Sequence, residues 1–338
     1  VFCQGSLVED CSHYSRVHHL VAELMAPSNW RVNAAVESNL GHSTPTLRNP
    51  AYVATIDPGD YASVLFTPSA LGVTNCGKLW PIEFAPLSIE ITFAQPQDAV
   101  IATQSQHPVG RLSSQAYVIN NLHLQCSQVI VDSALSNSYK SLLASGRSLT
   151  IAIQTIFTQA HVHQANSTSA QISMVRALSK LGIVFVSYTD SEDNLRNHEA
   201  ISFANPSLFI QSGNETTQWA RFEHTLETQL QLDSFLYPET KMDSFGEHFA
   251  KLQEAAATYD QRLATLSITP ELYNSDGFVT GINLMRAPGS AFSGLNTRTG
   301  SLLLLKVNNI KTTISKIYAH LVGTVLIECR ADSCSVYD

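Results

Sequence analysis

The sequence predicts a mainly β protein built from two antiparallel β-sandwiches in tandem, with a few short helices. In most segments apolar residues alternate with polar ones, which is the pattern of strands that bury one face. The order of a strand, a helix and further strands occurs twice, once in each half of the chain. This repeated order favours two domains of similar design. Helices that interrupt many strands fit neither a helical bundle nor a parallel α/β fold.

The length of the chain also favours two domains. It has 338 residues, which is more than one hydrophobic core usually holds. A polar stretch over residues 189–200 predicts a linker between the halves. We therefore expect an N-terminal helical arm over residues 1–27, a first sandwich over 28–190 and a second sandwich over 191–338.

The N-terminal arm is predicted to be helical over residues 6–25. Ser6 and Glu9 have the spacing of a capping box, and apolar residues recur on one helix face. In residues 28–116, turn-forming Pro, Gly and Asn residues separate β-rich runs such as YVATI, LSIEITFA and DAVIATQ. This pattern indicates many short strands.

The middle of the chain has the clearest alternation. Residues 122–132 place Leu122, Leu124, Cys126 and Ile130 on one face, which predicts a strand with one wet face. Residues 133–146 have apolar residues at helical spacing, and the glycine at 146 is a typical helix end. Further strands are predicted over residues 148–164, 170–178 and 182–188.

The second half repeats this order. Residues 226–235 alternate, with Leu226, Leu230 and Leu232 on one face. A helix is predicted over residues 244–258, where Ser244 and Glu247 form a second capping-box pattern. The remaining predicted strands cover residues 277–284, 300–307, 316–330 and 334–338.

Composition limits the kinds of partner that the protein can have. Charged residues make up only 14% of the chain and hydrophobic residues 44%, with a net charge of −8. No run of Lys and Arg exists, so direct nucleic-acid binding is not expected. A surface with few charges suits burial against neighbouring subunits, because charged groups are costly to desolvate. No apolar run reaches the ~18–20 residues of a transmembrane segment.

Motifs that would bind a phosphate or a metal are incomplete. The loop GLNTRTG, residues 294–300, lacks the Lys and the spacing of a P-loop, and we expect a connection between strands whose glycines take positive φ. His161 and His163 project from one strand face, but no nearby ligand completes a metal set, so a wet strand end is expected. The six cysteines form no CxxC pair and are expected to be buried thiols. We therefore predict no catalytic, cofactor-binding or metal-binding residues.

Two alternatives to a structural role stay open at this point. A carbohydrate-binding β-sandwich of a secreted or surface protein would use Trp30, Trp80 or Trp219, although core aromatics are the simpler interpretation. A hydrolase on a β scaffold would assemble its site from distant residues, since no nucleophile elbow or paired carboxylates are visible.

Several phrases of the sequence are similar to a known family. The segment from SITPELYNSDGFVTG to SLLLLKV, residues 267–307, and HLVGTVLIECRADSCSVYD, residues 320–338, resemble major capsid proteins of the double jelly-roll lineage. The likeness is greatest to those of polinton-like viruses and related eukaryotic DNA viruses. Residues 130–151 resemble the helix-bearing excursion of the first jelly roll, and residues 6–25 the N-terminal helix. The sequence departs from the family at the last strands, where Gly323, Cys329 and Cys334 interrupt a plain hydrophobic pattern.

The resemblance implies two jelly rolls that stand upright in a shell. Three chains would form a homotrimer of about three times 36.9 kDa, roughly 111 kDa, and these pseudo-hexagonal capsomers would tile an icosahedral capsid around DNA. Penton and minor capsid proteins would be further partners, and the virion would be the location. Such a protein has no catalytic residues and no cofactor. Loops such as 286–300 would be free to face outward or to clasp neighbouring subunits.

Overall fold

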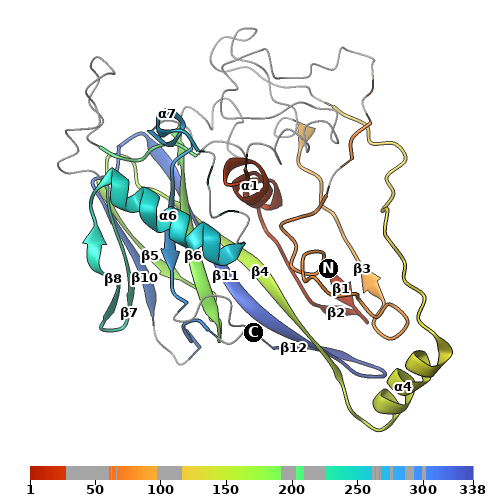
Figure 1. Cartoon of the computed structure of the whole chain (residues 1–338). Coiled ribbons are helices and arrows are strands. Elements are labelled where there is room, and N and C mark those ends of the chain that lie inside the picture. The colour runs from red at the N-terminus through yellow and green to blue at the C-terminus, as the bar shows by residue number, and fades with distance from the viewer. Residues whose placement is uncertain are drawn as a thin grey trace.

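The computed structural model is mainly β, as predicted, with antiparallel sheets and short helices (Figure 1). It describes residues 1–27, 61, 63–65, 67–96, 116–191, 203–208, 226–260, 263, 266, 268–274, 277–285, 293–298 and 302–337. The predicted strands YVATI and DAVIATQ lie outside these ranges, and so does most of the predicted linker.

Eight strands between residues 149 and 329 form a two-layered sandwich. One sheet has the order β4-β11-β6-β9 and the other the order β5-β10-β7-β8, while β12 pairs with β11. The eight strands are β4 Leu149–Val162, β5 Ser169–Met174, β6 Leu181–Asp190, β7 Glu227–Leu232, β8 Phe235–Met242, β9 Val279–Asn283, β10 Leu303–Asn308 and β11 Ile314–Cys329. The additional strand β12 covers Cys334–Tyr337.

The pairing of these strands is nested. The first strand pairs with the eighth, the second with the seventh, the third with the sixth, and the fourth with the fifth. A long hairpin that is folded over in this way, with four antiparallel strands in each sheet, is a jelly roll. The described residues therefore contain one complete jelly roll.

The predicted boundary between the two domains, at residues 190 and 191, falls inside this jelly roll. Strands β4, β5 and β6 precede the boundary, yet they pair with β11, β10 and β9 from beyond it. Nested pairing joins segments that are far apart in the sequence, and local alternation does not reveal such pairs. A separate sandwich over residues 28–190 is not present among the described residues, and a second jelly roll stays a prediction.

The N-terminal residues form a small sheet and a short helical region beside the jelly roll. Strand β1, Phe2–Cys3, pairs with β2, Ser6–Leu7, and with β3, Leu87–Ser88. Helix α1, Tyr14–His18, continues into the π-helix η1, His19–Leu24. The capping box predicted at residue 6 is wrong, because Ser6 lies in a strand. The Glu9 carboxylate instead accepts hydrogen bonds from the backbone N–H groups of Gly72 and Val73, at 2.7 and 3.1 Å.

Helix α6, Phe245–Tyr259, lies between β8 and β9 and begins as the sequence predicts. The Ser244 hydroxyl accepts a hydrogen bond from the backbone N–H of Glu247 at 3.2 Å. The buried side of the helix packs on β9 and reaches β7 through His248, whose Nε2 lies 3.1 Å from Thr228 Oγ1. Shorter helices are α4, Ser133–Ala144, and α7, Pro270–Asn274. Within the described ranges, no helix is long and apolar enough to span a membrane.

The hydrophobic core has two parts. The larger cluster draws side chains from both sheets of the jelly roll, from α6 and from the N-terminal helical region. The smaller cluster lies where β4 and β11 extend beyond the sandwich, and the N-terminal sheet packs against it there (Figure 1). Strands β4 and β11 therefore connect the two parts.

Candidate functional site

Residues 116–132 form an extended segment that runs along one side of the molecule and ends at α4 (Figure 1). Alternation predicted a strand here with one buried face. That prediction is wrong, because no described strand pairs with the segment and the predicted buried face is exposed. Its members Leu122, Leu124, Cys126 and Ile130 are all exposed. A strand buries one face only when neighbouring strands and a second layer cover it.

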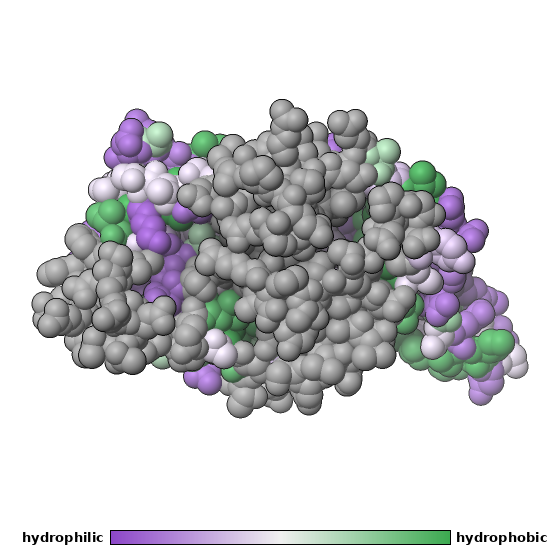
Figure 2. Space-filling view, turned by 90° about the horizontal axis from the view of Figure 1, so that it is seen from above, coloured by the Kyte–Doolittle hydropathy of each residue, from purple (hydrophilic) through white to green (hydrophobic). Residues whose placement is uncertain are grey.

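Hydrophobic side chains are exposed along the whole of this stretch and into α4. Ile130 is 88% exposed and Leu122 66%. The space-filling view shows hydrophobic surface on the corresponding side of the molecule (Figure 2). We call residues 116–144 the apolar segment. Its exposed large hydrophobic residues are Val118, Ile119, Leu122, Leu124, Val129, Ile130, Val131, Leu135 and Tyr139. Contiguous apolar surface of this kind marks an interaction site in soluble proteins.

Helix α4 is well formed but is held to the rest of the chain by surface contacts. The Asp132 carboxylate caps it by accepting a hydrogen bond from the backbone N–H of Leu135 at 2.7 Å. Lys140 Nζ lies 2.8 Å from Glu83 Oε1, and this hydrogen-bonded ion pair lowers the pKa of Glu83. Both side chains are more than half exposed, so the pair contributes little to stability. The helix buries Leu143 and leaves Leu135 exposed, while the Tyr139 ring lies 6.2 Å from that of Phe84.

A buried arginine fastens the N-terminal helix to the jelly roll. Arg16 on α1 donates from Nε to Ser187 Oγ at 3.1 Å and from Nη2 to the carbonyl of Tyr188 at 3.2 Å. Its guanidinium lies 4.5 Å from the ring centre of Phe203 and 4.3 Å from that of Tyr318. Planar stacking combined with fixed hydrogen bonds is the geometry that Arg provides and Lys does not. The helix is thus part of the folded unit.

The same region contains a Ser–His pair that sequence reasoning missed. His320 Nε2 lies 2.9 Å from Ser187 Oγ, and His320 Nδ1 lies 2.9 Å from Thr158 Oγ1. Burial, together with the nearby charges of Arg16 and His13, holds the pKa of His320 well below its ordinary value. Ser187 and His320 are completely buried, so no substrate can reach this pair. Its role is to satisfy polar groups inside the sheet.

The paired histidines lie at the end of β4. His163 is buried, its ring Nε2–H donates to the carbonyl of Ser167 at 2.9 Å, and its backbone N–H donates to Ser315. The expected wet strand end is therefore wrong for His163. His161 is half-buried. Its pKa is lowered mainly by burial and to a smaller extent by the charge of His163. Among the described residues, no group of three metal-ligating side chains includes either histidine.

The glycine-bounded loop forms backbone hydrogen bonds with residues 178–181 over its described part, residues 293–298. Gly294 has φ 139°, as the sequence predicts. Leu295 exchanges backbone hydrogen bonds with Leu181, and the backbone N–H of Thr297 donates to the carbonyl of Leu178 at 2.8 Å. These bonds attach residues 295–297 to residues 178–181, and the expectation that the loop faces outward or clasps a neighbouring subunit stays a prediction. Residues 286–292 lie outside the described ranges.

Among the described residues, no tryptophan presents a fully exposed ring face on which a sugar could stack. Trp80 packs against the smaller core cluster, and its indole N–H donates to the carbonyl of Ala85 at 2.7 Å. A ring used in this way supports the interpretation as a core aromatic. Trp30 and Trp219 lie outside the described residues.

Comparison with known proteins gives partial structural likeness. No family model and no curated protein matches the sequence. The PBCV-1 virus capsid overlaps with a TM-score of 0.38 at 7% identity, over 59% of this chain and 54% of that chain. PBCV-1 VP54, fitted into a reconstruction of the virophage Sputnik, gives 0.39 at 8% identity, over 61% and 54%. The major capsid protein P2 from bacteriophage PM2 gives 0.25 at 11% identity, over 56% and 46%.

The matching region spans about half the length of these solved structures. All of the TM-scores are below 0.5. The function proposed next therefore rests on the geometry of this chain and on its sequence.

Proposed function

We propose that this chain is a major capsid protein, a structural subunit whose trimers form pseudo-hexagonal capsomers of an icosahedral DNA-virus shell. The observation that carries the proposal is the apolar segment, residues 116–144. It exposes nine large hydrophobic side chains on an extended backbone and on α4. Exposed apolar patches of this kind mark sites of protein–protein interaction in soluble proteins.

The backbone of this segment supports self-association in a second way. Residues 122–131 follow a bend at Asn121, which has φ 55°, and no backbone hydrogen bond joins them to a strand within the described ranges. A chain segment whose N–H and C=O groups find no strand partner in the described ranges can pair with the edge of another sheet. A second copy of this chain supplies such edges at the outer strands of its jelly roll, which are β5 and β8 in one sheet and β4 and β9 in the other.

The jelly roll is suited to the same role. Its two four-stranded sheets bury their inner faces against each other. Jelly rolls occur in viral capsids, lectins and cupins, so the fold by itself does not select among these functions. The low content of charged residues, 14%, favours the capsid role, because much of a shell subunit's surface is desolvated.

The sequence resemblance to double jelly-roll capsid proteins supplies the finer features of the proposal. They are a homotrimer, contacts between capsomers, a location in the virion, and penton and minor capsid proteins as further partners. No enzymatic activity and no direct sequence-specific nucleic-acid binding form part of this proposal. A net charge of −8 agrees with the second point.

Light scattering on the purified chain tests the proposal. We expect a trimer of roughly 111 kDa, three times 36.9 kDa, and hexagonal particles in electron micrographs. Leu124→Ser combined with Ile130→Ser should weaken each subunit contact of the trimer by about 3 kcal/mol, which is about 100-fold in its equilibrium constant, because each buried aliphatic side chain contributes at least about 1.5 kcal/mol.

The matched control is Val175→Ser. Val175 is 83% exposed but lies outside the apolar segment, so this variant should associate like the wild type. A wild-type chain that is monomeric at micromolar concentration would contradict the proposal. Equal trimer stability in the double variant and the control would show that the apolar segment is not the contact.

A further inference from the structure

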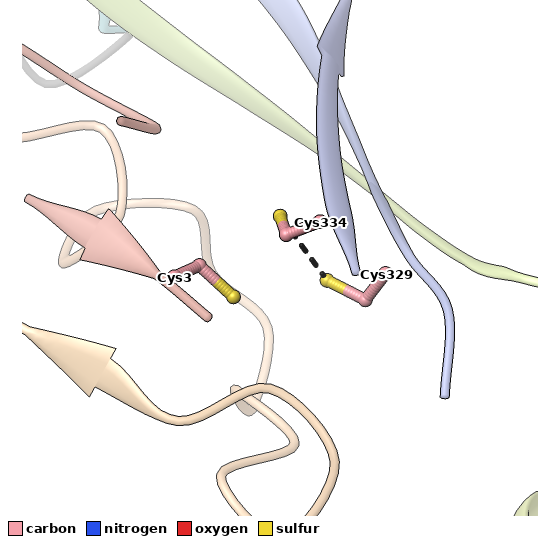
Figure 3. A group of neighbouring side chains, drawn as sticks. All are labelled: Cys3, Cys329 and Cys334. Atoms are coloured by element: carbon pink, nitrogen blue, oxygen red, sulfur yellow. Dashed lines mark hydrogen bonds between the residues drawn. The ribbon is translucent and has the colours of Figure 1, made fainter. Parts of the chain in front are cut away.

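Three cysteine thiols from opposite ends of the chain meet in the smaller core cluster (Figure 3). Cys3 lies on β1, Cys329 ends β11 and Cys334 begins β12. Their Sγ atoms all lie within 4.8 Å of one another, and all three residues are buried. The sequence predicted separate buried thiols and no metal site, since the cysteines are not spaced as CxxC.

The hairpin between β11 and β12 presents two of these thiols side by side. Cys329 and Cys334 are opposite each other in the strand register, and the backbone N–H of Arg330 donates to the carbonyl of Ser333 at 2.8 Å to close the turn. The two Sγ atoms are 4.0 Å apart. The C-x4-C spacing of this hairpin lies within the range of zinc-binding loops.

The third thiol is positioned by the N-terminal sheet. Cys3 pairs with Ser6 and Leu87, which holds β1 between two strands. The neighbouring side chain of Gln4 donates from Nε2 to the carbonyls of Phe84 and Arg330, at 2.7 and 3.4 Å. Contact with residue 330 brings β1 to the hairpin turn itself. The three ligands are therefore oriented before any ion binds, which reduces the entropic cost of binding.

The chemistry of the group fits a soft or borderline metal ion. Sulfur is the only ligand type in the group, and thiolate ligands select zinc or copper(I) over magnesium or calcium. A Zn–S bond of about 2.3 Å places the sulfurs of a tetrahedral site about 3.8 Å apart. The 4.0 Å between Cys329 and Cys334 is close to this edge length, whereas a disulfide bond requires about 2.05 Å.

We propose that Cys3, Cys329 and Cys334 bind one Zn²⁺ ion, which joins the N-terminal strand to the C-terminal hairpin. Three thiolates occupy three positions of a tetrahedron, and water takes the fourth. Burial raises the pKa of Cys329 to about 11 and that of Cys3 further, and zinc ligation requires the thiolate form. Binding therefore releases protons to the solvent, and zinc affinity rises with pH.

Metal analysis of the full-length chain tests the proposal. We expect one zinc per chain after loading under reducing conditions and gel filtration. Cobalt(II), used as a spectroscopic probe, should give the thiolate-to-metal absorption of a tetrahedral sulfur site. Cys3→Ser, Cys329→Ser and Cys334→Ser should each lower zinc affinity by more than about 100-fold, since loss of a ligand exceeds the 10–100-fold effect of losing a partner that only orients one.

Two cysteine variants serve as matched controls. Cys76→Ser alters a thiol that packs against the same apolar cluster but lies outside the group of three, and Cys126→Ser alters an exposed thiol. Both should retain one zinc per chain. Loading of the wild type needs no variant to fold, so it decides the question even if a serine variant is unstable.

Three results would overturn the proposal. The first is a wild-type chain without zinc above the level of a buffer control. The second is equal zinc retention in all five variants. The third is a mass lower by two hydrogen atoms in the chain purified without reductant, with the two hairpin cysteines joined, because a disulfide would then occupy the site.

Discussion

The packing of α6 on β9 depends on a glycine that admits the helix at close range. A Cβ atom added at Gly281 would lie 2.8 Å from Ala255 Cβ and 2.8 Å from Leu252 Cα, both on α6. It would also lie 3.2 Å from the carbonyl oxygen of Lys251. Carbon atoms pack at about 3.5–4.0 Å, so the helix must move by roughly 0.7–1 Å to admit a methyl group.

The expected cost of Gly281→Ala follows from this overlap. Inserting a methyl group into a packed core costs about 1–3 kcal/mol. Alanine also lowers the conformational entropy of the unfolded chain relative to glycine, and this effect stabilises the folded state by about 0.4–1 kcal/mol. We therefore expect a net loss of about 1–2 kcal/mol in the free energy of unfolding, or roughly 1.5–3 °C in Tm for a chain of 338 residues. Gly281→Val, which adds two further methyl groups, should cost more.

Urea unfolding followed by circular dichroism measures this difference. Gly246→Ala is the matched control, because Gly246 lies in the first turn of the same helix and an added Cβ meets no atom within 4 Å. The control should stabilise the chain by about 0.4–1 kcal/mol. If Gly281→Ala proved as stable as the wild type while the control behaved as expected, close approach of α6 would not be what this glycine provides.

Two further predictions concern buried polar groups. Arg16→Met should lower the free energy of unfolding by about 2–4 kcal/mol, because Ser187 and the carbonyl of Tyr188 lose a charged donor. If the urea midpoint of this variant equalled that of the wild type, Arg16 would not anchor the N-terminal helix. Burial lowers the pKa of His248 from 6.5 to about 4, while the carbonyl of Ser244 and the charge of Asp243 act in the opposite direction. The unfolded chain then binds the proton first, so this contribution to stability is complete above pH 6.5 and is lost as the pH falls toward 4. From about pH 7 to about pH 5 the loss should be about 2 kcal/mol in the wild type and absent in His248→Gln, and parallel pH profiles of the two proteins would refute this assignment.

Strand and helix positions in the second half of the chain could be predicted because local patterns determine them. The leucines at 226, 230 and 232 are buried on β7, and the capping box at Ser244 begins α6. Each of these features depends on residues within a few positions of one another. The predicted strands over 300–307 and 316–330 match β10 and β11 for the same reason.

Features that depend on distant residues could not be predicted. Alternation over residues 122–132 is a strand pattern, but whether a partner strand covers it is decided elsewhere in the chain. Glu9 has capping-box spacing from Ser6, yet the backbone of residues 72 and 73 binds its carboxylate. The cysteine group is likewise invisible in the sequence, since Cys3 lies more than three hundred positions from Cys329.

Strand β11 has a consequence for how the chain is made. It lies between β4 and β6 and pairs with both, yet it follows β6 by well over a hundred residues. At a translation rate of about 5–20 residues per second, the nascent β4 and β6 wait roughly 7–28 s on the ribosome before their shared neighbour emerges. Their unpaired edges can pair with other nascent chains during this interval. When many copies are synthesised in one cell, we expect chaperones to protect these edges until the last strands are complete.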